Sequence, residues 1–146
     1  MTAGPRPRVL VLCTGNSCRS QMAEGWIRHD LGDRVDVVSA GTHPSYVHPL
    51  AIRVMGEAGV DLSGHTSKSV LRFQHEPMDL VVTVCDSARE ACPVFPGAMR
   101  TVHDSIPDPV GHGHGDPDAM LEAFREVRDL IRRRIVARVR QELGLT

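Results

Sequence analysis

The sequence predicts an α/β protein in which a parallel sheet carries helices on both faces. Short apolar runs typical of strands alternate with segments of helical periodicity, and glycine, proline or polar loops separate them. The chain of 146 residues has the length of one domain, and no internal repeat or change of composition divides it. We therefore expect a single domain over residues 1–146, built around a four-stranded parallel sheet.

The expected strands are short apolar runs bounded by polar or glycine residues. Residues 80–84 are apolar except for Thr83, which is typical of a strand buried on both faces. Gly41 marks the end of the second run. The four runs are residues 9–13, 35–40, 80–84 and 101–103.

Helices are expected where apolar residues recur every three or four positions. Gly32 and Gly59 follow two such segments as helix stops. From Asp118 onward an apolar stripe continues almost to the end of the chain, which predicts one long amphipathic helix. We interpret its three arginines, 132–134, as part of a solvated face. The helical segments are residues 21–31, 48–58, 67–73 and 118–143.

The loop after the first strand has the layout of an oxyanion site that contains a nucleophile. Cys13 ends the apolar run, Gly15 allows close approach of the backbone to a ligand, and Arg19 stands where a helix begins. The N–H groups of such a loop bind a tetrahedral anion, and an arginine adds a planar fork that bonds two oxygens. The alternative is a buried structural cysteine beside a surface arginine.

Composition argues against several classes of function. The formal net charge of -1 disfavours nucleic acid or an anionic membrane as the partner, and the low aromatic content disfavours a base-stacking surface. The chain has neither a membrane span nor a signal-peptide core, so we expect a cytoplasmic protein. Four cysteines in a reducing compartment favour thiol chemistry or metal binding over structural disulfides.

Cys85 and Cys92 flank a segment of helical character that ends at Pro93. In a helix their Cα atoms lie roughly 10 Å apart along the axis, whereas a disulfide tolerates at most about 7 Å. A bridge between them therefore requires the helix to unwind. Two small buried residues are the alternative, but beside a nucleophilic Cys13 a pair of resolving thiols becomes the stronger hypothesis.

Asp108 lies between two prolines that hold it extended, and a carboxyl group fixed in this way suits a general acid. A stiff turn is the alternative. His112 and His114 lie in a glycine-rich loop that we interpret as flexible rather than metal-binding, so we expect no metal site.

Six motifs stand at residues 13–24, 39–41, 65–67, 81–85, 92–93 and 108–109. Together they resemble the thioredoxin-coupled arsenate reductases, which have the fold of low-molecular-weight protein tyrosine phosphatases. The resemblance extends over nearly the whole chain, and the cysteines at 13, 85 and 92 make it specific.

The resemblance implies an arsenate site at the loop. The amides of residues 14–19 and the Arg19 guanidinium would hold the anion, Asp108 would protonate the departing oxygen, and Ser20 would bond the Cys13 thiolate and lower its pKa. No catalytic step is implied for the Cys18 thiol. The implied substrate-binding residues are Thr14, Gly15, Asn16, Ser17, Cys18, Arg19 and Ser20.

The resemblance also implies a relay of three thiols. Cys13 attacks arsenate, Cys85 attacks the sulfur of Cys13 and releases arsenite, and Cys92 then attacks Cys85. Thioredoxin reduces the final Cys85–Cys92 disulfide. The implied protein is a monomeric detoxifying enzyme without a tightly bound cofactor, and its partners are arsenate and thioredoxin.

One position departs from the family pattern. Some members bind potassium near the loop through residues matching Asn16, Glu24, Ser39 and an aspartate, but Lys68 stands at that last position. We expect the Lys68 ammonium to take the place of the cation beside Glu24, and activity not to depend on potassium.

Two other functions remain open from the sequence alone. A phosphatase acting on phosphotyrosine or other phosphomonoesters would use the same loop and aspartate. It would leave Cys85 and Cys92 unexplained, and Val110 stands where an aromatic wall is expected. A non-catalytic thiol sensor or metal-binding protein would use the four cysteines and the histidine loop, but the spacing of the cysteines lacks the close pairs typical of zinc sites.

Overall fold

A four-stranded parallel sheet forms the centre of the protein, whose computed structural model describes residues 6–84, 95, 97–110 and 115–145. The strands are β1 (Arg8–Cys13), β2 (Asp36–Gly41), β3 (Leu80–Thr83) and β4 (Thr101–His103), in the order β2-β1-β3-β4. Leu10 of the central strand β1 pairs with Val38 on one side and Val81 on the other. All four expected strands are confirmed, with ends displaced by one residue at most.

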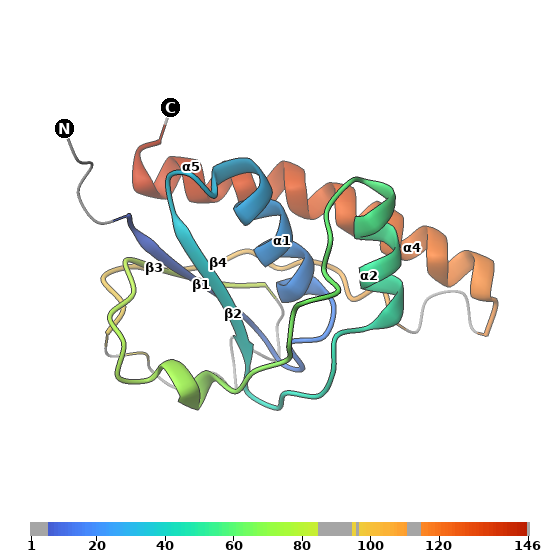
Figure 1. The fold of residues 1–146 in the computed structure, drawn as a ribbon, viewed down its shortest axis with the longest axis horizontal. Helices are drawn as coiled ribbons and strands as arrows, with labels where there is room; N and C mark the ends of the chain where they lie inside the picture. Colours follow the sequence, from blue (N-terminus) through green and yellow to red (C-terminus); the bar gives the residue numbers. More distant parts are fainter. Residues whose placement is uncertain (1–5, 85–94, 96, 111–114, 146) are drawn as a thin grey trace.

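Helices cover the two faces of the sheet unequally (Figure 1). The larger apolar cluster joins one face of the sheet to α1 (Arg19–Leu31), α2 (Pro49–Glu57), α4 (Pro117–Ile131) and α5 (Ala137–Leu143). The 3-10 helix η1 (Val70–Phe73) packs on the opposite face against Leu10 and Leu12. Helical cover on both faces is thus confirmed.

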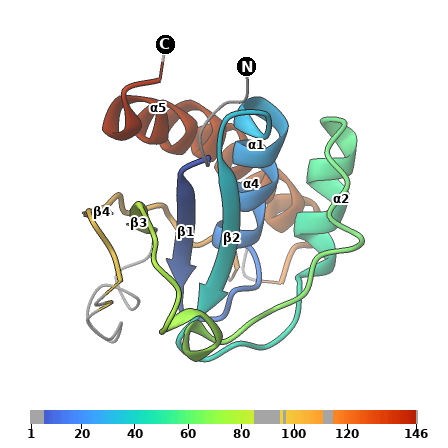
Figure 2. The same cartoon turned by 60° about the vertical axis from the view of Figure 1, so that its left-hand side comes forward.

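The helix expected over 67–73 is shorter than predicted. It begins at Val70, because the Ser67 hydroxyl is used to hold the loop after β1 and Ser69 caps η1 from an extended conformation. Figure 2 shows β1 and β2 ending at the same edge of the sheet, where their loops lead toward α1 and α2. Cys13 and Arg19, two of the residues identified in the sequence analysis, lie at that edge.

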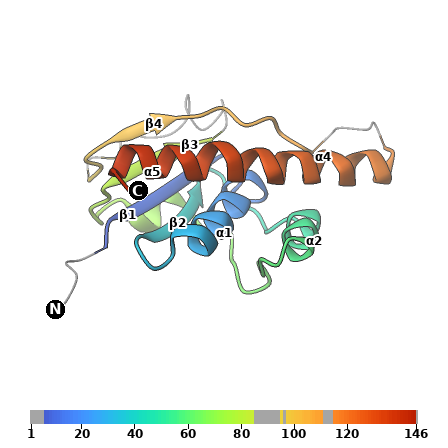
Figure 3. The same cartoon turned by 90° about the horizontal axis from the view of Figure 1, so that it is seen from above.

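The long C-terminal helix contains one widened turn. Residues Arg132–Val136 form a π-helical turn, η2, between α4 and α5, and the three elements run as one rod across the sheet (Figure 3). Buried apolar residues recur here every fourth position from Val127 through Val139. Four residues advance an α-helix by about 40° more than one turn, so the stripe drifts around the helix. The wider π turn absorbs the drift and keeps the stripe on the core.

No helix in the described part of the chain is long and apolar enough to cross a membrane.

Candidate active site

The carboxyl end of β1 opens into a pocket of about 290 Å³. Buried Cys13 ends the strand, residues 14–18 form a loop, and α1 begins at Arg19. Ligands of parallel α/β sheets bind at this edge. The structure brings Cys13, Arg19 and Asp108, three of the predicted catalytic residues, into one pocket wall. The other lining residues are Thr14, Gly15, Ser17, Cys18, Ser45, Tyr46, His48 and Val110.

The loop is held from outside by its carbonyl groups. Those of residues 14–17 each accept a hydrogen bond from a group outside the loop. Because a peptide N–H points opposite to the carbonyl of the same plane, the N–H groups of residues 15–18 are turned to the other side. The donors, in order of the carbonyls, are the His43 N–H, the Ser45 N–H with the Ser67 hydroxyl, the Gln21 amide and the His48 N–H.

Helix α1 begins without a side-chain cap. Its N-cap residue, Cys18, makes no side-chain capping bond, and its first turn contains no acidic residue. His48 and Asp116, by contrast, cap α2 and α4 with side-chain acceptors. The first N–H groups of a helix need acceptors, and a bound anion supplies them. The start of α1 therefore suits an oxyanion.

Arg19 supplies the cationic group of the pocket. Its side chain is 15% exposed, and Nη1 donates to the Ile106 carbonyl at 3.0 Å. Nη2 lies 3.6 Å from Oδ2 of Asp108. Nε is buried and has no acceptor among the described residues. A buried N–H that lacks an acceptor is costly, and an oxyanion in the loop would accept from it.

Asn16 fixes the shape of the loop from beneath. It is fully buried and has the left-handed backbone angle φ of 46°. Its Oδ1 accepts from the Lys68 N–H at 2.8 Å and from the Gln21 amide at 3.0 Å. Because both partners are donors, the atom that they contact must be the amide oxygen, and the other atom of the Asn16 side-chain amide is the nitrogen. Nδ2 is thereby directed to Ser20 and Ser39.

A directional chain of hydrogen bonds ends at the nucleophile. The Ser39 hydroxyl donates to Glu24 at 2.6 Å and so accepts from Asn16 Nδ2 at 2.9 Å. Asn16 Nδ2 also donates to the Ser20 hydroxyl at 2.8 Å. The Ser20 hydroxyl lies 2.8 Å from the Cys13 sulfur, and its proton can be donated to the thiolate, which has no proton of its own. A donated bond favours the charged form of its acceptor, so this chain stabilises the Cys13 thiolate.

Asp108 lies at the pocket mouth with its side chain half exposed. Its Oδ1 accepts from the Val110 N–H at 2.9 Å, and its Oδ2 faces Arg19. One oxygen is therefore anchored while the other points toward the anion position. This arrangement suits the general acid that the sequence predicts.

Cys18 shares the loop with Cys13 but lies in a different environment. Burial raises the pKa of the Cys18 thiol to about 11, and the negative charge of Asp108 acts in the same direction. The reactive form of cysteine is the thiolate. Cys18 is therefore a protonated, unreactive thiol at neutral pH, which agrees with a residue that has no catalytic step.

The buried Glu24 carboxylate lies behind the loop among cationic side chains. Arg28 Nη2 lies 2.8 Å from Glu24 Oε2, and Lys68 Nζ lies 3.8 Å from Oε1 and donates to the Thr66 carbonyl at 2.7 Å. Burial lowers the pKa of Lys68, and Glu24 opposes that change. Lys68 thus places a positive charge beside Glu24. Its replacement of a potassium ion stays a prediction.

Several pocket residues were not anticipated from the sequence. Ser45, Tyr46 and His48 come from the segment after β2, which ends at the same edge as β1. Since parallel strands end at the same edge of a sheet, the residues that follow the second predicted strand could have been expected near the loop after the first. Tyr46 is 60% exposed and lines the pocket. Val110 follows Asp108 and Pro109 as noted from the sequence, and the aromatic ring of the pocket comes instead from a loop distant in sequence.

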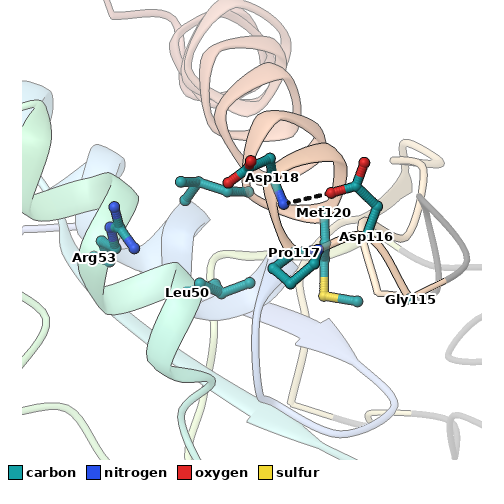
Figure 4. Close-up of a pocket in the computed structure, with 8 residues that line it drawn as sticks. Leu50, Arg53, Gly115, Asp116, Pro117, Asp118 and Met120 are labelled. Carbon is teal, nitrogen blue, oxygen red and sulfur yellow. Dashed lines mark hydrogen bonds between the residues drawn. The ribbon is translucent and has the colours of Figure 1, made fainter.

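A second pocket, of about 300 Å³, lies between the first turns of α2 and α4 (Figure 4). Leu50 faces Pro117 and Met120 across it, and Arg53 and Asp118 lie at its rim. The Asp116 carboxylate is already engaged, since it accepts from the Asp118 and Ala119 N–H groups. The lining therefore presents mainly apolar surface.

Four residues of the sequence analysis, Cys85, Cys92, His112 and His114, lie outside the described residues. Within the described ranges, no group of three histidine, cysteine or acidic side chains is arranged to hold a metal ion.

A thiol at a strand end, an anion-holding loop and an arginine at the helix start define a protein that binds an oxyanion against a cysteine. The chain belongs to the low molecular weight phosphotyrosine protein phosphatase family, whose sequence profile matches residues 8–143. The expected phosphatase-like fold is thus confirmed.

Within this family the chain is similar to proteins named arsenate reductase. The one from Halalkalibacterium halodurans is 44% identical over 87% of this chain and 91% of its own length. A solved arsenate reductase in its phosphate-binding state is 32% identical, with a TM-score of 0.77 over 96% of this chain and 99% of the other. The thioredoxin-dependent arsenate reductase of Corynebacterium glutamicum is 30% identical, with a TM-score of 0.63 over 90% of this chain and 61% of the other.

Brief treatment with iodoacetamide at pH 7 is expected to label Cys13 and to leave Cys18 unlabelled. With a pKa of about 11 for its thiol, Cys18 is thiolate in about one molecule in ten thousand at this pH. Peptide mass spectrometry measures both sites. Saturating phosphate should slow the labelling of Cys13 by filling the loop. Equal labelling of the two cysteines would contradict the assignment.

Ser20→Ala is expected to slow the alkylation of Cys13 at pH 6 by about tenfold, because a hydrogen bond donated to a thiolate contributes roughly 1.5 kcal/mol. The absorbance of the thiolate at 240 nm, followed against pH, should rise later than in the wild type. Ser63→Ala, in an exposed loop, is the matched control. An unchanged titration in Ser20→Ala would mean that the serine does not serve as the donor.

Proposed function

We propose that this protein reduces arsenate to arsenite through three thiols, with thioredoxin as the final reductant, and thereby detoxifies arsenic. The observation that carries the proposal is Cys13 at an anion loop whose carbonyls are held outward, beside an Arg19 Nε that has no acceptor in the described part of the chain. The relatives named arsenate reductase support arsenate as the oxyanion. The thioredoxin-dependent structural relative supports thioredoxin as the reductant.

In the first step the Cys13 thiolate attacks arsenic and an As–O bond breaks. The amides of Thr14 to Arg19 and the Arg19 side chain hold the remaining oxygens. The departing oxygen takes a proton from Asp108 Oδ2, the oxygen that faces Arg19, and leaves as water. The product is a thiol-arsenate adduct in which arsenic is still pentavalent.

In the second step Cys85 attacks the sulfur of Cys13. A disulfide forms, the As–S bond breaks, and its electron pair stays on arsenic, which leaves as trivalent arsenite. Cys92 then attacks Cys85 and frees Cys13. Thioredoxin reduces the Cys85–Cys92 disulfide. In total, arsenic acid and two thiols give arsenous acid, one disulfide and one water, so atoms and electrons balance.

Hydrolysis of phosphomonoesters is the second candidate function. The same loop and Asp108 would serve phosphoryl transfer, and Tyr46 in the pocket wall favours an aryl ester. This activity does not use Cys85 or Cys92. Slow release of 4-nitrophenol from its phosphate that persists in Cys92→Ser would identify it as a side reaction of Cys13.

The proposal includes the setting in which the enzyme works. We place it in the cytoplasm as a monomer of one domain, without a tightly bound cofactor and without nucleic acid or membrane as a partner. The net charge of -1 supports the last two points.

The relay predicts that arsenate-dependent NADPH oxidation, coupled through thioredoxin and its reductase, is lost in Cys13→Ser, Cys85→Ser and Cys92→Ser. Each substitution breaks one transfer, so multiple turnover should fall to the background rate. Cys92→Ser should still release one arsenite per molecule, because the Cys13–Cys85 step remains. Normal turnover of Cys92→Ser with thioredoxin would overturn the relay and favour an external thiol that resolves the adduct.

Replacing sodium by potassium at constant ionic strength is expected to leave kcat/KM within about twofold, because the Lys68 ammonium already balances Glu24. Lys68→Asp should make kcat/KM respond to potassium, since it replaces the ammonium by a second carboxylate. The same assay measures both proteins. A several-fold rise of the wild-type kcat/KM in potassium would refute this role of Lys68.

A further inference from the structure

His48 stands where the anion loop, helix α2 and the pocket wall meet. Its backbone N–H donates to the Ser17 carbonyl at 3.0 Å and so helps to orient the loop. Its ring Nδ1 accepts from the Leu50 N–H at 3.1 Å and caps α2. The ring also lines the pocket that contains Cys13 and Asp108. One residue therefore links the start of α2 to the site.

The capping bond fixes the tautomer of the ring. Nδ1 accepts a hydrogen bond, so it carries no proton, and the proton of the neutral ring lies on Nε2. Protonating Nδ1 would set two donors against each other and break the cap. Burial also lowers the pKa of His48, and the charge of Asp108 opposes that change. The ring is thus kept as a neutral donor.

Two aromatic rings fix the plane of the imidazole. The Phe124 ring centroid lies 4.8 Å from that of His48, at an interplanar angle of 39°. The Tyr46 ring stacks on His48 at 6.2 Å and 25°. Rotating the ring would lose both contacts and the cap. The edge that carries Nε2–H is therefore held opposite to Leu50.

Asp108 and His48 line the same pocket, and the negative charge of Asp108 acts on the His48 ring. We propose that His48 is a positioning residue for Asp108: when the oxyanion is bound, its Nε2–H donates to Asp108 Oδ1 and leaves Oδ2 to deliver the proton. The Val110 N–H already anchors Oδ1 at 2.9 Å, so a second donor would complete its orientation. This inference rests on the proposed function.

Neutrality of the donor matters for the chemistry. An imidazolium would add a second positive charge beside Asp108 to that of Arg19, favour the carboxylate further and oppose its use as an acid. A neutral N–H orients the carboxyl group while proton transfer from the other oxygen stays open. The cap on α2 thus keeps a pocket residue in the charge state that the reaction needs.

A matched pair of substitutions separates the two edges of the ring. His48→Asn places an acceptor near Nδ1, which keeps the cap, but it lacks a donor at the position of Nε2. His48→Gln places an amide N–H near Nε2 and loses the cap. The readouts are the rate of the first arsenite release from reduced enzyme, the KM for arsenate and the thermal midpoint.

We expect His48→Asn to slow the first arsenite release by about tenfold, with KM and the thermal midpoint unchanged. His48→Gln should have a lower thermal midpoint and a rate within about threefold of the wild type. In an Asp108→Asn background, His48→Asn should have no further effect, because His48 acts through Asp108. Wild-type kinetics for His48→Asn, a change mainly in KM, or an undiminished effect in that background would each overturn the proposal.

A spectroscopic test is independent of turnover. In the phosphate-loaded protein, the imidazole nitrogen resonances should show protonated Nε2 and unprotonated Nδ1, and the Nε2 resonance should shift in Asp108→Asn. The opposite tautomer, or no shift, would overturn the proposal. If the wild type releases no arsenite, the proposed function fails and this spectrum alone decides the role of His48. If the wild type releases arsenite and His48→Asn matches it, the inference alone fails.

Discussion

The site depends on four consecutive carbonyl groups, those of residues 14–17, being held away from the pocket. A loop of this length has no regular partner for its peptide groups, and buried peptide groups require partners. Donors from α1, from the segment after β2 and from residues near 67 satisfy the carbonyls and turn the N–H groups the other way. The anion site is therefore formed by the tertiary structure around the loop more than by the loop itself.

The parallel sheet makes this arrangement possible. Because β1 pairs in parallel with β2 and β3, the segments that follow these strands leave the sheet at one edge. Nucleophile, anchoring donors and pocket wall are therefore brought together from positions far apart in the chain. The two thiols of the loop lie in different environments at this edge of the sheet. The Cys13 sulfur lies 2.8 Å from the Ser20 hydroxyl, which Asn16 holds in place, whereas burial and the charge of Asp108 raise the pKa of the Cys18 thiol.

Local patterns predicted most of the fold, because strands and helices here follow ordinary periodicity. The apolar run ending at Cys13 and the stripe of the last helix both appear as expected. The π turn was not predicted. It compensates for the gradual rotation of the apolar stripe around the helix, which becomes large only over several turns. From the sequence, Gly41 only marks the end of a strand. In the structure, a Cβ at this position would lie 2.5 Å from the Thr14 carbonyl oxygen. Such a requirement depends on which segment the fold places opposite, and neighbouring residues do not encode it.

The same limit applies to the site. Cys13, Arg19 and Asp108 stand in recognisable local patterns, and the structure gathers them. Asn16 and His48 act through bonds to residues distant in sequence, and so their contributions could not be predicted from spacing alone. The position of Lys68 could be recognised from the sequence, because a lysine stands there in place of the aspartate of the family motif.

The ammonium of Lys68 has a consequence for how the site is assembled. A dissolved ion that balances a buried carboxylate is present only in proportion to its concentration and can be lost to competing ions. A side chain tethered to the same backbone has a high effective concentration that the surrounding medium does not set. Lys68 lies beside Glu24. The positive charge behind the anion loop is therefore part of the polypeptide itself, and folding alone brings it to Glu24.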